Sequence, residues 1–401
     1  VIQPLAGGMV GMLNEQDGLY NLFLRGIKNG EETEEIHTIS CVQDGINPYD
    51  DYERYLALAE GEDLEFLISN TTEAGISFDD SDTLEGTPHS SFPAKVTALL
   101  YKRFNHFDGA ADKGLTIIPC ELIETSNSFH NTLVDRIVPG YPKDDIDAYQ
   151  SQLEFKDNLI VSAETFLLWV IEGDEALKAK IPFDQIDDNV LVVEDMQPYR
   201  TRKVRILNGA HTTMVPFSLL YGNETVKETV DNEFTGKFVR DAVFNEINPT
   251  LDLSEEELNE FAAAVFDRFR NPFIKHLLSS IALNTVSKFK VRVLPSLLAF
   301  EQAYNRLPEN LTFALACLIR FYKGTWKGKA LPIKDDAAVV AFFDEVWKED
   351  NYAAVSQAVL SNLTFWDQDL TKIEGLEERI TTALALIEEN GVEEAYKKYT
   401  V

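Results

Sequence analysis

The sequence has few cysteines and no long apolar run. Its three cysteines, Cys41, Cys120 and Cys317, include no CxxC pair, and such sparse usage favours a reducing compartment. No run of about 18 consecutive apolar residues indicates a membrane-spanning helix. The first residues carry neither a basic leader nor a cleavage-site pattern, so we expect a cytoplasmic protein.

Positive charge is scarce. The chain has 36 Lys and Arg against 67 Asp and Glu, a formal net charge of −31. Such a surface repels nucleic acid and anionic lipid, so we expect neither as a partner. It also repels anionic substrates and cofactors, so a site that binds them needs local positive charge. The cluster Arg200, Arg202, Lys203 and Arg205 supplies such charge; the alternative interpretation is a solvated basic helix face.

The usual zinc-ligand patterns are also missing. The six histidines, at positions 37, 89, 106, 130, 211 and 276, form no H-x3-H motif and no Cys–His cluster, so we predict no metal site. Without a metal, oxidation of an alcohol requires another base. A lysine can act as this base when desolvation and neighbouring cations lower its pKa from about 10.4 toward 7–8.

Secondary-structure patterns divide the chain into two parts. In the first part, β-like runs alternate with helical patterns, which predicts a parallel α/β sheet. The β-like runs are residues 18–25, 35–41, 64–69, 114–120 and 189–195, and the helical patterns are residues 49–60 and 92–104. From residue 196 the pattern is nearly all helical, with a capping box at Ser254–Glu257. Further helices are expected at residues 273–283, 311–322, 336–348 and 376–390.

The stretch from Pro198 to Thr212 concentrates polar groups on one predicted helix. Pro198 suits the first turn of a helix. At about 100° per residue, Asn208 lies roughly 140° and His211 roughly 80° around the axis from Lys203, so the three share one broad polar face. An amine, an amide and an imidazole on one face could take a proton from an alcohol and hold the resulting carbonyl. The alternative is a half-buried helix with solvated basic residues.

The spacing of Lys203, Asn208 and His211 (K-x4-N-x2-H) resembles the catalytic helix of the mannitol dehydrogenase family, the metal-independent long-chain polyol dehydrogenases. Residues 131–139 resemble the V-D-R-I-x-P signature of that family. Other stretches are similar to the branch that reduces tagaturonate to altronate: residues 16–20, 69–76, 92–95, 119–123 and 268–272. The resemblance implies an α/β plus all-α protein, with a Rossmann-like dinucleotide-binding domain over residues 1–195 and a helical catalytic domain over residues 196–401.

The resemblance also implies roles for individual residues. Lys203 would act as the general acid/base, while Asn208 and His211 would hydrogen-bond the reacting oxygen in the manner of an oxyanion hole. Asp135 would orient the lysine or a proton-relay water. The alternative for Asp135 is an ion pair with Arg136 or another base.

The NAD site is implied at the polar segment that follows residues 64–69. Asn70, Thr71, Thr72 and Glu73 would line its nicotinamide end; the alternative is a Thr-rich turn. A dinucleotide-binding domain normally opens with a strand and a G-x-G turn. Residues 1–4 resemble the second strand of such a domain, so the first strand and its turn are missing from this sequence. The segment near residues 123–127 is also shorter than in the family, and we expect both stretches in the full protein.

Three residues are predicted to contact the substrate, and Arg200 among them favours a sugar acid. Arg200 replaces a Glu common in polyol enzymes, and a guanidinium can bind a carboxylate bidentately. Glu121 stands where those enzymes carry an amide, and Lys288 aligns loosely with a substrate-side lysine. We therefore predict reversible reduction of D-tagaturonate to D-altronate with NADH in hexuronate catabolism. Activity on fructuronate or mannitol, or a non-catalytic sugar-acid-binding protein, are the alternatives.

Overall fold

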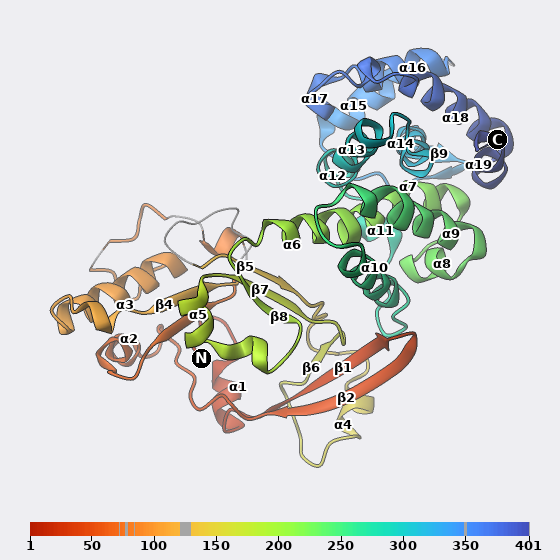
Figure 1. The fold of residues 1–401 in the computed structure, drawn as a ribbon. Coiled ribbons are helices and arrows are strands. Elements are labelled where there is room, and N and C mark those ends of the chain that lie inside the picture. The colour runs from red at the N-terminus through yellow and green to blue at the C-terminus, as the bar shows by residue number, and fades with distance from the viewer. Residues whose placement is uncertain (72, 77–78, 84, 121–129, 349–350, 401) are drawn as a thin grey trace. The chain divides into compact units, whose positions relative to one another are not determined.

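The computed structural model describes residues 1–71, 73–76, 79–83, 85–120, 130–348 and 351–400, with side chains left out at 73 and 74. The chain divides into two compact units, Val1–Met196 and Gln197–Val401. Figure 1 colours the first unit from red to yellow-green and the second from green to blue. None of the described helices combines the length and apolar character needed to cross a bilayer.

The first unit contains short helices and eight strands among its described residues. Its helices are α1 (Val10–Glu15), α2 (Tyr52–Ala57), η1 (Leu58–Glu60), η2 (Glu73–Ile76), α3 (Phe92–His106), η3 (Ala111–Lys113), α4 (Ile146–Gln150), α5 (Glu175–Lys180) and η4 (Pro182–Gln185). Its strands are β1 (Tyr20–Lys28), β2 (Glu31–Ile39), β3 (Phe66–Ser69), β4 (Thr116–Pro119), β5 (Thr132–Asp135), β6 (Val161–Ala163), β7 (Leu168–Glu172) and β8 (Val190–Val193).

The strands pair in mixed directions. β3–β4, β1–β6 and β7–β8 are parallel, as the alternation of strands and helices predicts. β1–β2 and β5–β7 are antiparallel, so the expectation of a wholly parallel sheet is wrong. In the β1–β2 pair, the antiparallel direction follows from the short turn that connects the two strands. Lys28 pairs with Glu31 across a tight turn, and Gly30 in that turn has φ +82°, a conformation that glycine tolerates.

Helix α3 links β3 to β4, and its sequence explains its N-terminal cap and its buried face. Ser91 caps its N-terminus by accepting a hydrogen bond from Ala94 N, and a proline occupies the first turn. Ala98 and Leu99 are buried, and Leu99 packs with Tyr55 and Ala59 in one apolar cluster. This packing holds α3 against α2 and η1.

The second unit is helical apart from one short hairpin among the described residues. Its elements are α6 (Gln197–Arg202), the π-helix η5 (Lys203–Asn208), α7 (Gly209–Tyr221), α8 (Val226–Asp231), α9 (Glu233–Asp241), the π-helix η6 (Ala242–Ile247), η7 (Asn248–Thr250), α10 (Glu255–Phe269), α11 (Leu278–Ile281), α12 (Thr285–Arg292), α13 (Leu294–Tyr304), α14 (Glu309–Phe321), β9 (Thr325–Trp326), β10 (Lys329–Ala330), α15 (Ala337–Val346), α16 (Tyr352–Leu360), α17 (Leu363–Trp366), η8 (Leu370–Lys372), α18 (Leu376–Asn390) and α19 (Val392–Tyr399).

Helix α14 forms the centre of this unit. All its residues after Glu309 are buried, and it packs against α7 and α18. A buried carboxylate satisfies its first turn: Glu246 accepts hydrogen bonds from Asn310 N and Leu311 N, both at 2.8 Å. The orphan N–H groups of a helix start are thus paired inside the core.

Two helix expectations need correction. Ser254 does cap α10 by accepting from Glu257 N, but the Glu257 carboxylate bonds the Ser254 hydroxyl, at 2.9 Å, rather than its backbone. The predicted helix over residues 273–283 is wrong for most of its length, since only Leu278–Ile281 is helical. The backbone of Glu224 and Val226 bonds Leu278 and His276 instead, so tertiary pairing replaces the helical pattern.

Candidate active site

The carboxyl ends of β3 and β4 meet at one edge of the first unit. The parallel register aligns Ser69 with Pro119, and Cys120 N donates a hydrogen bond of 2.7 Å to Ser69 O. Ligands of α/β sheets bind beyond such strand ends. Asn70, which is exposed, and Thr71, which is half-buried, follow β3 directly and so lie at this edge.

The other residues predicted for this edge are only partly described. Thr72 and Glu121 lie outside the described residues. Glu73 begins η2, but its side chain is also outside them. Their predicted contacts with cofactor and substrate therefore stay predictions.

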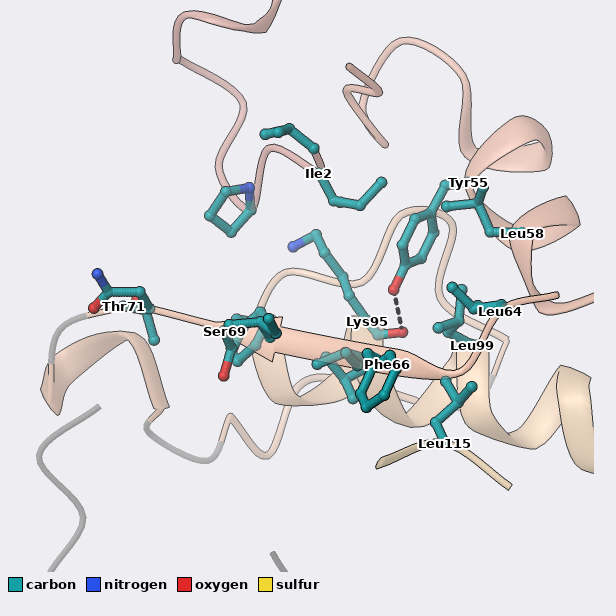
Figure 2. Close-up of a pocket in the computed structure, with 17 residues that line it drawn as sticks. Ile2, Tyr55, Leu58, Leu64, Phe66, Ser69, Thr71, Lys95, Leu99 and Leu115 are labelled. Carbon is teal, nitrogen blue, oxygen red and sulfur yellow. Dashed lines mark hydrogen bonds between the residues drawn. The ribbon is translucent and has the colours of Figure 1, made fainter. Parts of the chain in front are cut away.

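A cavity of about 310 Å³ opens beside β3 (Figure 2). Its wall is mostly apolar, and its polar members include Ser69, Asn70, Thr71 and Lys95. This volume lies at the lower end of the range for small-molecule sites. Asn70 and Thr71 follow the carboxyl end of β3 at this wall, and their role at the cofactor stays a prediction.

Asp135 ends β5 and is only 6% exposed. The neighbouring Arg136 donates from Nε to Phe166 O at 2.9 Å and from its terminal nitrogen to Thr165 O at 3.4 Å. Burial lowers the pKa of Arg136. Asp135 belongs to the first unit and Lys203 to the second, so its role in orienting the lysine stays a prediction.

The predicted catalytic helix is not α-helical throughout. Lys203–Asn208 is a π-helix between α6 and α7. Its i→i+5 bonding puts more residues in each turn than an α-helix does, so angles calculated at 100° per residue do not apply across it. The segment begins at Lys203 and ends at Asn208, and His211 follows in the first turn of α7. Single π turns within α-helices often mark functional sites.

The basic cluster around Lys203 does not act as one group. Arg202 is 7% exposed, and its guanidinium lies over the Phe261 ring at 4.4 Å. Arg205 donates from its terminal nitrogen to Val291 O at 3.2 Å, and burial lowers its pKa. Arg202 therefore anchors the end of α6 to α10, and Arg205 anchors η5 to α12. Arg200, in α6, is half-buried and remains the candidate for carboxylate binding.

His211 is surrounded by aromatic rings and by positively charged side chains. Its ring centroid is 4.6 Å from Phe269 and 5.0 Å from His276. Its Nε2 atom is buried and has no hydrogen-bond partner in the described structure. Burial, followed by the charges of His276, Arg268, Arg292 and Lys288, holds the pKa of His211 well below 6.5. The imidazole is therefore neutral at physiological pH, and its buried Nε2 atom has no hydrogen-bond partner among the described residues.

Asn208 lies three residues before His211 in the sequence. The charge of Lys288 is one of those that lower the pKa of His211. The Asn208 backbone carbonyl accepts from Thr212 Oγ1 at 2.9 Å, while its side-chain amide bonds no described residue. Lys288 Nζ donates to Ile281 O at 3.1 Å. Burial and then Arg292 lower the pKa of Lys288, and Asp335 opposes them. Lys288 is thus a half-buried cation near His211, and its role on the substrate side stays a prediction.

Sequence reasoning missed three members of this group: Arg268, His276 and Arg292. Arg268 lies within a stretch that carries the family resemblance, next to Phe269, but nothing in the sequence places it beside His211. Gly209 contributes to the arrangement, because a Cβ there would lie 3.2 Å from Arg292 O. Its small size permits close approach of α12 to the catalytic helix.

The described residues contain no group of three His, Cys, Asp or Glu side chains placed to hold a metal ion. The groups that do meet around His211 in the second unit are a second imidazole and several cations. Such a set can hydrogen-bond an oxygen atom and attract an anion.

Comparison with known proteins extends over the whole chain. The sequence model of the mannitol dehydrogenase Rossmann domain matches residues 1–125 and 121–185, and that of the mannitol dehydrogenase C-terminal domain matches residues 195–388. The chain is 42% identical over 434 positions to the altronate oxidoreductase of Yersinia pestis bv. Antiqua (strain Nepal516), covering 100% of this chain and 90% of that protein. Identity to the altronate oxidoreductase of Bacillus subtilis (strain 168) is also 42%, over 431 positions, with 100% and 88% covered.

Solved structures share the fold. A substrate-free D-sorbitol dehydrogenase superposes with a TM-score of 0.78 at 19% identity, covering 96% of this chain and 85% of that one. Mannitol 2-dehydrogenase of Pseudomonas fluorescens, in a ternary complex with NAD and D-mannitol, gives 0.63 at 19% identity, covering 98% and 85%. From the matches to both domain models and the identity to full-length relatives, the chain belongs to the mannitol dehydrogenase family.

Proposed function

We propose that the protein is an NAD-dependent oxidoreductase that interconverts D-tagaturonate and D-altronate. The observation that carries the proposal is the neutral His211, whose buried Nε2 has no hydrogen-bond partner among the described residues, set among Lys288, Arg268 and Arg292. The imidazole suits the reacting oxygen, and the cations suit a substrate that carries its own carboxylate. Relatives named altronate oxidoreductase, at 42% identity over the full chain, support the same choice of substrate.

In the proposed reaction, the cofactor supplies or accepts the hydride when bound. Lys203 donates a proton to the substrate oxygen during ketone reduction and takes it back during alcohol oxidation. The Asn208 amide and His211 Nε2 hydrogen-bond that oxygen and an adjacent hydroxyl, which stabilises the charge that develops there. Because His211 stays neutral, it orients the substrate without competing with Lys203 for the proton.

The strand ends of the first unit would hold the cofactor. Asn70 and Thr71 lie at the carboxyl edge of β3, beside the cavity, and Thr72 and Glu73 are assigned to the same site by resemblance. Asp135 would orient Lys203 or a relay water, and Glu121 would contact the substrate. The three cysteines are free thiols, which favours a reducing compartment such as the cytoplasm.

The test is NADH consumption with tagaturonate, fructuronate and fructose, each measured with and without a metal chelator. Rapid turnover of tagaturonate alone, unchanged by the chelator, is the expected result. Preference for fructuronate or fructose would reject the assigned substrate. Loss of activity with the chelator would reject the lysine mechanism. If NADH binds but none of the three substrates reacts, the proposed reaction is wrong.

A further inference from the structure

His276 lies beside His211 but is given no role in the reaction proposed above. The two ring centroids are 5.0 Å apart, and the ring planes meet at 75°. The ring of Phe269 makes a comparable contact, with its centroid 4.6 Å from that of His211. His276 therefore belongs to the immediate surroundings of the imidazole that is predicted to bind the substrate.

Backbone hydrogen bonds fix the position of His276. Its carbonyl accepts from Val226 N at 3.0 Å, and its own N–H donates to Ile274 O, also at 3.0 Å. Two residues further on, Leu278 N donates to Glu224 O at 2.9 Å. The segment is thus held on both sides of His276, and a residue that recognises a ligand needs such a rigid support.

The imidazole of His276 has hydrogen-bonding groups that the protein leaves unused. The side chain is half-buried, and neither ring nitrogen bonds a residue that the structure describes. Polar groups that are withdrawn from water without a partner cost free energy. Packing against His211 requires neither nitrogen, because the apolar ring of Phe269 packs there as well. A polar ligand that bonds His276 would explain why an imidazole occupies this position.

The ligand group that suits His276 is a hydroxyl rather than a carboxylate. Burial lowers the pKa of His276, so the ring is neutral at physiological pH. A neutral imidazole has one N–H donor and one nitrogen acceptor, and a hydroxyl both accepts and donates. A carboxylate only accepts, and cations bind it better. Around His211 those cations are Arg268, Arg292 and Lys288.

A keto-uronate carries hydroxyls on successive carbons next to its ketone. The two imidazoles are 5.0 Å apart, and a carbon–carbon bond is about 1.5 Å long. With the reacting oxygen at His211, a hydroxyl a few bonds along the chain thus comes within reach of His276. D-Tagaturonate and D-fructuronate differ in the configuration of one such hydroxyl, on the second carbon from the ketone.

We propose that His276 is a specificity-determining residue, which hydrogen-bonds this hydroxyl and so favours D-tagaturonate over D-fructuronate. The proposal rests on the function proposed above and adds to it a residue for stereochemical selection. In the epimer this hydroxyl has the opposite configuration, so the imidazole loses its partner. A site built to bond a hydroxyl rejects a substrate that cannot supply it, because a polar group of the site is then left unpaired.

The experiment measures kcat/KM for tagaturonate and for fructuronate in the full-length protein and its His276→Phe variant. Phenylalanine keeps a ring against His211 and removes both nitrogens. Phe269→Leu is the matched control, because it changes the packing of His211 without removing a hydrogen-bonding group. His276→Asn and His276→Gln place an amide near the positions of Nδ1 and Nε2 respectively. NADH affinity and melting temperature are recorded for every protein.

In His276→Phe, the ratio of kcat/KM for tagaturonate to that for fructuronate should fall by about 10- to 100-fold, through slower reduction of tagaturonate. Phe269→Leu should change both substrates alike, and NADH affinity should match that of wild type in both variants. One of the two amide variants should keep most of the wild-type ratio and the other should lose it. The amide that keeps the ratio identifies the nitrogen that bonds the hydroxyl.

An equal fall for both substrates in His276→Phe, as in the control, would overturn the assignment and leave His276 as packing for His211. An unchanged ratio would overturn it too. If His276→Phe does not fold, the two amide variants decide, and equal ratios in them would reject the proposal. All these results leave the proposed function intact, provided that wild type reduces tagaturonate. Failure of wild type to reduce tagaturonate would reject the proposed function and this inference together.

Discussion

The imidazoles of His211 and His276 lie edge to face, with ring centroids 5.0 Å apart and planes at 75°. Burial lowers the pKa of both residues. Two histidines in contact, with Arg268, Arg292 and Lys288 near His211, cannot both carry charge at moderate cost. The pair is therefore neutral at physiological pH.

The first prediction concerns the protonation of His211. Because its pKa is held well below 6.5, its NMR signals should not titrate between pH 6 and about 8.

The lowered pKa of His211 also makes the stability of the protein depend on pH. The unfolded chain takes up a proton below about pH 6.5 while the folded state does not, so the free energy of unfolding should fall as the pH drops below that value. In His211→Asn this fall should be smaller. A His211 titration centred near 6.5 would contradict the prediction.

Lys203→Met should abolish turnover without affecting the cofactor. We expect kcat to fall by roughly 10²- to 10⁴-fold, the range for removal of a general acid/base, while the NADH dissociation constant stays unchanged. Lys227→Met removes a surface lysine that pairs with Asp231 at 2.5 Å and serves as the control. Stopped-flow measurement of hydride transfer separates chemistry from binding. Near-normal kcat in the Lys203 variant would remove this residue from the mechanism.

Replacing the cations near the substrate should change specificity toward carboxylates. Arg200→Ala and Arg292→Ala are each expected to raise KM for a keto-uronate by roughly 10- to 100-fold, the range for a lost charged hydrogen bond, and to change KM for a neutral ketose much less. Arg205→Ala is the matched control, because its guanidinium donates to the Val291 carbonyl. Equal effects on both substrates would reject a carboxylate-binding role for the variant concerned.

Glu246 gives a prediction about stability that does not involve the active site. Burial raises its pKa to about 7, against the opposing hydrogen bonds from Asn310 and Leu311. The unfolded carboxyl ionises near 4.5, so between these two values the folded state holds more protons. The free energy of unfolding should therefore fall by roughly 3 kcal/mol as the pH rises from about 4.5 to 7.

Urea denaturation of wild type and Glu246→Gln across this pH range tests the prediction. The stability difference between the two proteins should change with pH, because glutamine does not ionise. Glu246→Ala should be destabilised at every pH by about 2–3 kcal/mol or more, since the N–H groups of Asn310 and Leu311 lose their buried acceptor. Parallel pH curves for wild type and Glu246→Gln would show that Glu246 is not the titrating group.

Much of the fold was predictable because its signals are local. The β-like run at residues 64–69 and the helical pattern at residues 92–104 correspond to β3 and α3, whose hydrophobic patterns match their secondary structure. The order of an α/β domain followed by a helical domain is confirmed by the matches to both domain families. The antiparallel pairing of β1 with β2 was not predicted, since strand direction depends on the turn rather than on the strands themselves.

The site was predictable only where motif spacing carried the information. Lys203, Asn208 and His211 were identified from their spacing and the family resemblance, and their catalytic roles stay predictions. The environment of His211 was not predictable, because Arg268 and Arg292 reach it through packing of α10 and α12 on the catalytic helix. The π-helix was also missed: its residues have ordinary helix propensity, and only hydrogen bonding in the folded state distinguishes it from an α-helix.

The π-helix between α6 and α7 makes chain length itself a determinant of the site. Relative to a continuous α-helix, such a segment accommodates one additional residue without interrupting the helix. A deletion of one residue between Lys203 and Asn208 would let the segment close into regular α-helix. Because the wide turn absorbs the additional residue, the helix beyond such a deletion, His211 included, would keep nearly the same orientation about the axis relative to Lys203. The length of this segment thus decides which side chains stand between Lys203 and His211, and leaves the relative orientation of those two residues almost unchanged.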